Sequence, residues 1–222
     1  PFVFDDIPAI TENFTIRHLG ALDRVLAPQS DGGVTVGGRP LVNLSLAVNY
    51  AAGGIAPAGY HVLNLAIHLS AALVLFAVAR RTLRQPTLAA RFGAASTSLA
   101  LAIAGIWALH PLQTESVTYI VQRAESLMGL CYLAVLYCFI RSASTARPAL
   151  WLALSFVACL AGMASKEVMV SAPLMVLLYD RTFVAGSFVA AWRSRRGYYA
   201  ALAATWLLLA WLVLGGGGSR GV

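Results

Sequence analysis

Six uncharged stretches make up most of this chain, and they require an apolar environment. They cover residues 40–79, 92–114, 126–140, 148–165, 168–179 and 197–219. A helix that crosses a bilayer needs about 20 predominantly apolar residues. Only 11% of the residues are charged, whereas soluble domains average about 25%. The sequence therefore predicts an all-α polytopic membrane protein.

The short links between these stretches differ in charge, and the difference predicts their orientation. One set of alternate links contains a single acid, Asp180, and a large group of arginines: Arg80, Arg81, Arg84, Arg91, Arg141, Arg147, Arg181, Arg193, Arg195 and Arg196. The positive-inside rule places these links in the cytoplasm. The other links, with nearly all of the acids, are then periplasmic or luminal. Because the basic residues are dispersed and form no stripe, nucleic-acid binding is not predicted.

The apolar stretches predict about six transmembrane helices, near residues 60–79, 92–109, 126–140, 149–165, 168–179 and 198–214. We expect a seventh helix before residue 1. Residues 1–59 are interpreted as the first outer loop, with short interfacial helices that include 41–52. Residues 60–214 form the transmembrane bundle, and the Gly-rich 215–222 segment is an outer loop or an added tail.

The third and fifth predicted helices are too short to span unless they begin with charged residues. Arg123 and Glu125 precede the third helix, and Lys166 and Glu167 precede the fifth. Charge at that depth is costly and normally faces protein or a water-filled cavity. The outer ends of the helices are therefore predicted to surround such a cavity.

Two adjacent carboxylates, Asp5 and Asp6, follow Phe4 near the start of the chain. Adjacent carboxylates repel, so one can have a raised pKa and act as a general base, or both can bind a divalent cation. An acidic turn without a catalytic role is the alternative.

A polar stripe occurs in the first apolar helix. His61, Asn64 and His68 share one face at 100° per residue. Such a stripe serves either function or structural hydrogen bonding. Its spacing is not that of known zinc sites.

The second outer link carries His110, Glu115, Arg123 and Glu125 around one bend. Pro111 suits the first turn of a new helix, and residues 115–121 are predicted to lie flat on the outer surface. Arg123 either pairs with Glu125 or holds a lipid-linked phosphate.

The third outer link is the compact turn of Lys166 and Glu167. Lys166 is predicted to lie near an anion, and a salt bridge to an outer-loop carboxylate is the alternative.

In order and on one side of the predicted membrane, these clusters resemble the GT-C glycosyltransferases. The most similar members are the transmembrane and tetratricopeptide-repeat O-mannosyltransferases and their bacterial relatives. The resemblance covers residues 2–181 and is carried by Phe4-Asp5-Asp6, Arg39-Pro40-Leu41, Tyr60-His61, Asn64, His68, His110-Pro111, Thr114-Glu115-Ser116-Val117, Arg123, Glu125, Lys166-Glu167 and Tyr179-Asp180.

The resemblance implies a GT-C-type helical bundle with its active site on the outer face. It implies a polyprenyl- or dolichyl-phosphate sugar donor, a hexose such as mannose, and a hydroxyl acceptor on protein or glycan. It also implies a tetratricopeptide-repeat region beyond this chain. No particular cofactor is implied, and a divalent cation at Asp5 and Asp6 is left open. The Ala-, Gly- and Arg-rich composition favours a bacterial inner membrane over endoplasmic reticulum.

The resemblance also suggests roles for the site residues. Asp5 or Asp6 is the expected general base, and Arg123 and Lys166 are the expected phosphate ligands. The supporting polar residues are His61, Asn64, His68, His110, Glu115, Glu125 and Glu167. The alternative function is a membrane transporter or lipid flippase, in which the buried His, Glu and Lys side chains form a proton relay.

Overall fold

The computed structural model describes residues 1–27 and 36–215. Within these residues the chain consists of helices and connecting turns, without a strand. The predicted all-α fold is confirmed. Most of the Gly-rich 215–222 segment lies outside the described residues, and the predicted division at residue 59 stays a prediction.

All six predicted long helices are present. Their bounds are α3 Pro57–Leu83, α5 Ser96–Leu109, α7 Arg123–Ser142, α8 Pro148–Met163, α9 Ala172–Tyr179 and α10 Phe188–Gly215. A 3₁₀ segment, η6 (Glu167–Ser171), leads into α9. Proline begins α3 and α8, where its missing N–H has no helical partner to lose.

Fewer of these helices meet a length criterion for crossing a bilayer than the sequence predicted. In the described part of the chain, three are long and apolar enough: Pro57–Leu83, Ile120–Ser142 and Phe188–Leu214. A fourth is counted if α4 (Pro86–Phe92) and α5, bent by 95°, form one broken span. The apolar helix α8 has only 16 residues. A helix before residue 1 stays a prediction.

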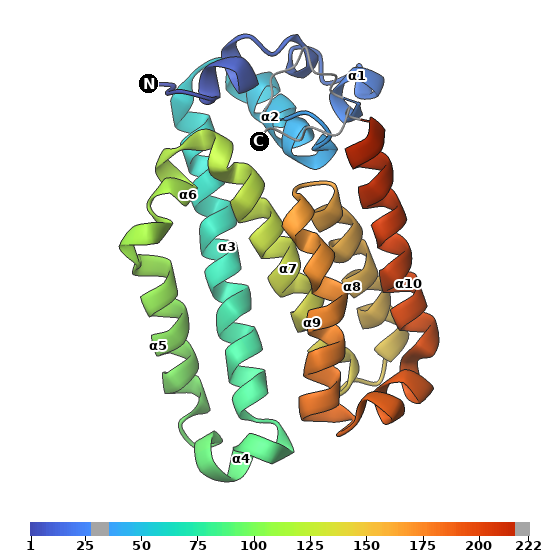
Figure 1. The fold of residues 1–222 in the computed structure, drawn as a ribbon. Coiled ribbons are helices and arrows are strands. Elements are labelled where there is room, and N and C mark those ends of the chain that lie inside the picture. Colours follow the sequence, from blue (N-terminus) through green and yellow to red (C-terminus); the bar gives the residue numbers. More distant parts are fainter. Residues whose placement is uncertain (28–35, 216–222) are drawn as a thin grey trace.

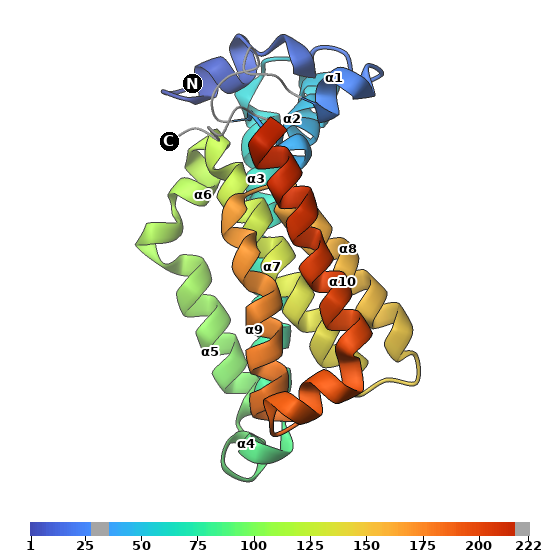
Figure 2. The ribbon, with the colours of Figure 1, turned by 45° about the vertical axis from the view of Figure 1, so that its right-hand side comes forward.

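Helices α7, α8, α9 and α10 pack around one apolar core, while α5 packs on the outer side of α3 (Figures 1 and 2). The core includes the fully buried Val135, Phe139, Cys159 and Met163. Large apolar side chains elsewhere point away from the protein: Leu73 is 69% exposed, Ile106 70% and Leu207 74%. Apolar exposure along long helices is what a lipid-facing surface requires.

A compact cap covers one end of this bundle (Figure 1). It is built from the short turns η1 (Ile7–Thr11) and η2 (Phe14–Ile16), α1 (Leu22–Leu26) and α2 (Pro40–Gly53). The predicted helix at 41–52 is therefore present as α2. Asn13 and Asn43 hold the cap together, since both side chains are fully buried and share a 2.9 Å hydrogen bond.

The opposite end contains α4, the link between α7 and α8, and the start of α10 (Figure 1). This is the end to which the arginine-rich links belong. Asp180 lies buried here and accepts hydrogen bonds from Arg195 at 2.9 Å and from Tyr199 at 2.5 Å. Arg195 has non-helical φ and ψ angles of −137° and 27°, so α10 is kinked where this ion pair forms.

Candidate functional site

Asp6 fastens the N-terminal segment to the connection between α6 (Glu115–Thr118) and α7. Its carboxylate is 1% exposed and accepts hydrogen bonds from the backbone N–H groups of Val121, at 2.9 Å, and Val3, at 3.3 Å. Burial raises the pKa of the Asp6 carboxyl, while these N–H groups and the charge of His61 oppose the rise. Both oxygens of Asp6 therefore have structural partners.

Asp5 differs from its neighbour because its side chain is exposed. The Asp5 backbone N–H donates to the Tyr119 hydroxyl at 3.3 Å. Burial raises the pKa of Tyr119; the Asp5 backbone N–H opposes this rise, and the charge of Asp5 adds to it. The preceding residue, Phe4, has a φ of 44°, a left-handed conformation that is unusual for a bulky residue and costs about 1–3 kcal/mol. Strained backbone thus presents the accessible carboxylate.

Arg123 is buried and hydrogen-bonded to two neighbouring helices, and its predicted role as a phosphate ligand stays a prediction. The side chain is 0% exposed. Its Nε donates to Asn64 at 2.7 Å, Nη2 to the Tyr60 carbonyl at 3.0 Å, and Nη1 to the Ser45 carbonyl at 3.2 Å. In this structure the donors of Arg123 bind α2 and α3, so the side chain links these helices to α7.

The polar stripe of α3 makes structural hydrogen bonds along its whole length. His61 Nδ1 lies 3.0 Å from the Val117 carbonyl, and His68 Nε2 lies 3.0 Å from the Ala108 carbonyl. Asn64 donates to the Ile120 carbonyl at 3.2 Å. These contacts end on backbone carbonyls of the facing segments rather than on one another, so the stripe forms no continuous proton relay.

The turn between α8 and η6 carries two ion pairs. Lys166 binds Glu125 of α7, and Glu167 lies 3.7 Å from Arg39 at the start of α2. Lys166 and Glu125 stay partly exposed, with side chains 20% and 41% accessible. A tight contact supports this turn, because a Cβ on Gly162 would lie 2.5 Å from the Met169 sulfur. Lys166 and Glu167 therefore lie on a tightly packed turn.

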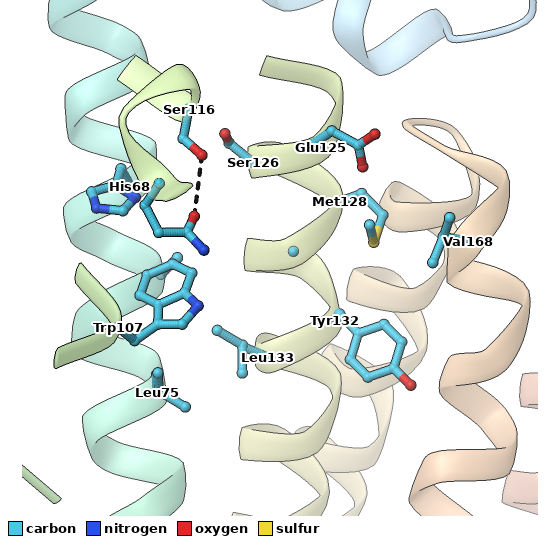
Figure 3. Close-up of a pocket in the computed structure, with 13 residues that line it drawn as sticks. His68, Leu75, Trp107, Ser116, Glu125, Ser126, Met128, Tyr132, Leu133 and Val168 are labelled. Carbon is cyan, nitrogen blue, oxygen red and sulfur yellow. Dashed lines mark hydrogen bonds between the residues drawn. The ribbon is translucent and has the colours of Figure 1, made fainter. Parts of the chain in front are cut away.

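An elongated cavity lies between α3, α5, α6 and α7, with a volume of about 360 Å³ (Figure 3). Figure 3 shows Ser116, Ser126 and Glu125 at one end and Leu75, Leu133 and Tyr132 further along. The remaining lining residues are His68, Ala71, Trp107, Gln113, Met128, Gly129 and Val168. The cavity is within the size range of small-molecule sites.

The cavity joins a polar end to an apolar wall. The polar end has the Glu125 carboxylate, which Lys166 neutralises, and a Ser116 hydroxyl bonded to Gln113 at 3.3 Å. From Glu125 to Leu133 the wall extends about 12 Å along α7. The cavity has free space beside Gly129, because a Cβ there would meet no atom within 4 Å. Such a cavity suits a molecule with a polar head and an apolar chain.

Of the predicted site residues, Glu125 and His68 line this cavity, and Lys166 binds Glu125 at its edge; the others lie outside it. Glu115 is exposed on α6. His110 is also exposed, accepts a hydrogen bond from the Leu112 N–H at 3.2 Å, and borders a separate hollow with Ile103 and Trp107. The predicted residues thus share one end of the bundle without forming one site. Asp6, Asn64 and Arg123 are buried, and Asp5, His110 and Glu115 are exposed.

Sequence reasoning missed several contributors to this region. Ser126 and Gly129 line the cavity, and Tyr119 contacts Asp5. Their only sequence signal was closeness to the charged bend. In the described ranges, no three His, Cys, Asp or Glu side chains gather into a group that could hold a metal ion. Asp6 engages both oxygens with backbone N–H groups, so the acidic pair is not arranged as a chelate.

Comparison with known proteins places the chain in a family. It is 34% identical over 185 residues to Drosophila melanogaster protein O-mannosyl-transferase Tmtc1 and 32% identical over 191 residues to Tmtc2, covering 81% of this chain in each case. By this stretch of sequence, the chain belongs to the TMTC family. Human TMTC3 is 26% identical over 170 residues and covers 74% of the chain.

The chain spans about a fifth of the length of the TMTC proteins it matches, 20% for Tmtc1 and 19% for Tmtc2. No protein-family model matches the chain. No solved structure matches it either. The family assignment therefore comes from these TMTC relatives, and the resemblance predicted from the ordered clusters is confirmed.

Proposed function

We propose that the chain is part of a membrane glycosyltransferase that moves a hexose such as mannose from a polyprenyl-phosphate donor to a hydroxyl acceptor. The observation that carries this proposal is the cavity beside Glu125 and Lys166, apolar along its wall and polar at one end. Its TMTC relatives are named protein O-mannosyl-transferases. A lipid-linked sugar has the same division into a polar head and an apolar tail.

The donor is proposed to lie with its isoprenoid chain along Leu75, Leu133 and Tyr132. Its phosphate then lies at the end marked by Ser116 and Ser126. Lys166 is proposed as the cation at this end, because it binds Glu125, which lines the cavity. Glu125 holds Lys166 until the phosphate competes for it, and the ammonium then stabilises charge on the leaving phosphate.

Asp5 is proposed as the general base, because it is the exposed member of the acidic pair. The acceptor hydroxyl oxygen attacks the anomeric carbon, and Asp5 takes the hydroxyl proton. The bond between the anomeric carbon and the phosphate oxygen breaks, and the polyprenyl phosphate leaves with its electron pair. Tyr119, which contacts Asp5, belongs to the same connection that supplies Ser116 to the cavity.

Asp6 and Arg123 act as positioning residues in this scheme. Asp6 ties the strained N-terminal segment to Val121, and Arg123 ties α7 to α2 and α3. The active end is proposed to face the periplasm or lumen, since the arginine-rich links lie at the opposite end. Composition favours a bacterial inner membrane for this chain.

The test is a transfer assay with the purified full-length protein in nanodiscs. Radiolabelled mannosyl undecaprenyl phosphate and mannosyl dolichyl phosphate are the donors, and Ser/Thr peptides or glycans are the acceptors, with and without EDTA. Asp5→Asn should abolish transfer while the protein still inserts and folds. Wild-type turnover by Asp5→Asn would remove the base assignment.

The cavity is tested separately with a pair of substitutions at Gly129. Gly129→Leu places a bulky chain into the cavity and should raise the donor KM strongly, whereas Gly129→Ala adds one methyl group in open space and should change it little. Equal donor use by both variants would exclude this cavity as the donor site. Loss of transfer in the EDTA arm alone would establish that a divalent cation takes part.

A further inference from the structure

A second cavity lies at the other end of the bundle, and its charge is unlike that of the first. It has a volume of about 490 Å³ and lies between the end of α3 and the end of α7. Arg80, Arg81 and Arg84 line it together with Gln85, Tyr137 and Ser144. None of these residues takes part in the proposed transfer site.

The three arginines are held in place without being neutralised. Arg80 Nε donates to Thr97 at 3.1 Å, and Arg84 Nε donates to Ser96 at 2.9 Å. The Arg81 guanidinium lies 5.6 Å from the centre of the Tyr137 ring. Across residues 1–27 and 36–215, these guanidinium groups have no carboxylate partner, and the Nη atoms of Arg80 and Arg84 make no hydrogen bond.

The neighbouring Asp180 cannot neutralise the three arginines of the cavity. Asp180, the acid of the arginine-rich links, is fully buried and already accepts from Arg195 and Tyr199. Arg80 and Arg84 are one helical turn apart, a spacing at which like charges destabilise a helix. The cavity therefore has a net positive charge that an anion would stabilise, and free guanidinium edges suit phosphate oxygens.

The walls of the cavity indicate where the anion comes from. Phe76, Ala77 and Ile140 form its inner side, nearer the middle of α3 and α7. Tyr137 packs edge-on against Trp151, with ring centres 5.9 Å apart. Aromatic residues of this kind mark the level of lipid headgroups, and basic pockets between helix ends bind anionic headgroups. An apolar inner wall below the arginines fits acyl chains attached to a phosphate.

We propose that this arginine-lined cavity binds the phosphate headgroup of an anionic phospholipid, with Arg80 and Arg84 as its main ligands. A free phosphate offers the same charge but would leave the partly exposed Phe76 without an apolar partner. The lipid would link α3, α5 and α7 at this end, because Thr97 and Ser96 orient the arginines from α5.

Native mass spectrometry of the purified full-length protein tests this proposal. Phosphatidylglycerol, phosphatidylcholine, glycerol phosphate and inorganic phosphate are titrated as separate probes. Phosphatidylglycerol should bind, the zwitterionic lipid should bind more weakly, and the two soluble phosphates should not compete at equal concentration. Arg80→Gln/Arg84→Gln should weaken phosphatidylglycerol binding by about thirtyfold, from two surface charges.

The matched control is Arg147→Gln/Arg193→Gln, which removes the same charge from exposed positions outside the cavity. It should weaken phosphatidylglycerol binding by less than about threefold. Equal weakening by both pairs, or no preference over phosphatidylcholine, would overturn the proposal. Equal binding of inorganic phosphate would reduce the site to a general anion site. If the first pair does not fold, Arg84→Gln alone should weaken binding about fivefold.

Discussion

The carboxylate of Asp6 accepts a hydrogen bond from the backbone N–H of Val121 at 2.9 Å, although 115 positions separate the two residues. This contact closes the N-terminal cap onto the start of α7 and sets Asp5 beside Tyr119. It divides an acidic pair into a buried structural member and an exposed member.

Alanine substitutions should separate these two roles. Asp6→Ala leaves the N–H groups of Val121 and Val3 without their acceptor and should lower the free energy of unfolding by about 1–3 kcal/mol. Asp5→Ala removes an exposed side chain and should change it by less than about 0.5 kcal/mol, yet abolish transfer. Thermal unfolding in detergent and the transfer assay measure the two effects. Equal stability losses would contradict the division.

The raised pKa of Asp6 predicts a pH dependence of stability. The folded chain binds this proton more tightly than the unfolded chain, whose pKa is near 3.8. The contribution of Asp6 to stability is therefore largest at or below that pH and is lost as the pH rises through the raised pKa. The melting temperature of the wild type, relative to Asp6→Asn, should fall as the pH is raised from about 4 to 7. If the melting-temperature difference between wild type and Asp6→Asn stayed constant or rose with pH, the raised pKa of Asp6 would be refuted.

The Lys166–Glu125 pair should matter for donor use more than for stability. Both side chains are partly exposed, and such pairs contribute about 0–1 kcal/mol. Lys166→Met should therefore leave thermal unfolding nearly unchanged, while the donor KM rises about tenfold or more through loss of a charged phosphate contact. Glu167→Gln, one residue along the same turn, is the control and should have a smaller effect on the donor KM.

Replacing Arg123 should damage the fold. Arg123→Met leaves Asn64, the Ser45 carbonyl and the Tyr60 carbonyl without their donor, which should cost about 3 kcal/mol in unfolding free energy. Arg147→Met, at an exposed position, is the control. If Arg123→Met unfolded at the wild-type temperature and only its donor KM changed, the phosphate role predicted from sequence would be supported instead.

The turn that carries Lys166 should be sensitive to a single methyl group. Gly162→Ala would put a Cβ 2.5 Å from the Met169 sulfur, and such overpacking costs about 1–3 kcal/mol. Gly129→Ala is the matched control. Its methyl group meets open space, and alanine is more favourable than glycine inside a helix. Thermal unfolding should therefore rank Gly129→Ala above Gly162→Ala. The reverse order would show that Met169 moves without cost.

Helix positions were predictable because they depend on local composition. The stretches at 60–79 and 126–140 became α3 and α7, and both extend beyond the predicted limits. Which helices cross the membrane was less predictable. Helices α8 and α9 are short, and 3₁₀ turns such as η6 connect them. Residue type alone does not reveal where such a turn replaces another helical turn.

The surroundings of individual side chains were less predictable, and Arg123 illustrates the reason. Its place beside the charged bend favoured a ligand role, but an arginine at a helix start can turn toward solvent or toward the protein. The side chain turns inward because Asn64, Ser45 and Tyr60, from other helices, supply acceptors there. Those acceptors become neighbours only when α2 and α3 pack against α7.

By itself, the sequence determined the membrane environment, the helical class, the end of the bundle to which each charge belongs, and the family. These properties follow from hydrophobicity and charge order, which act locally along the chain. The tertiary structure decided that Asp5 is exposed while Asp6 and Arg123 are buried, and that Glu125 and Lys166 meet beside a cavity. Exposure and pairing depend on which helices pack together, and segments distant in the chain become neighbours only through that packing.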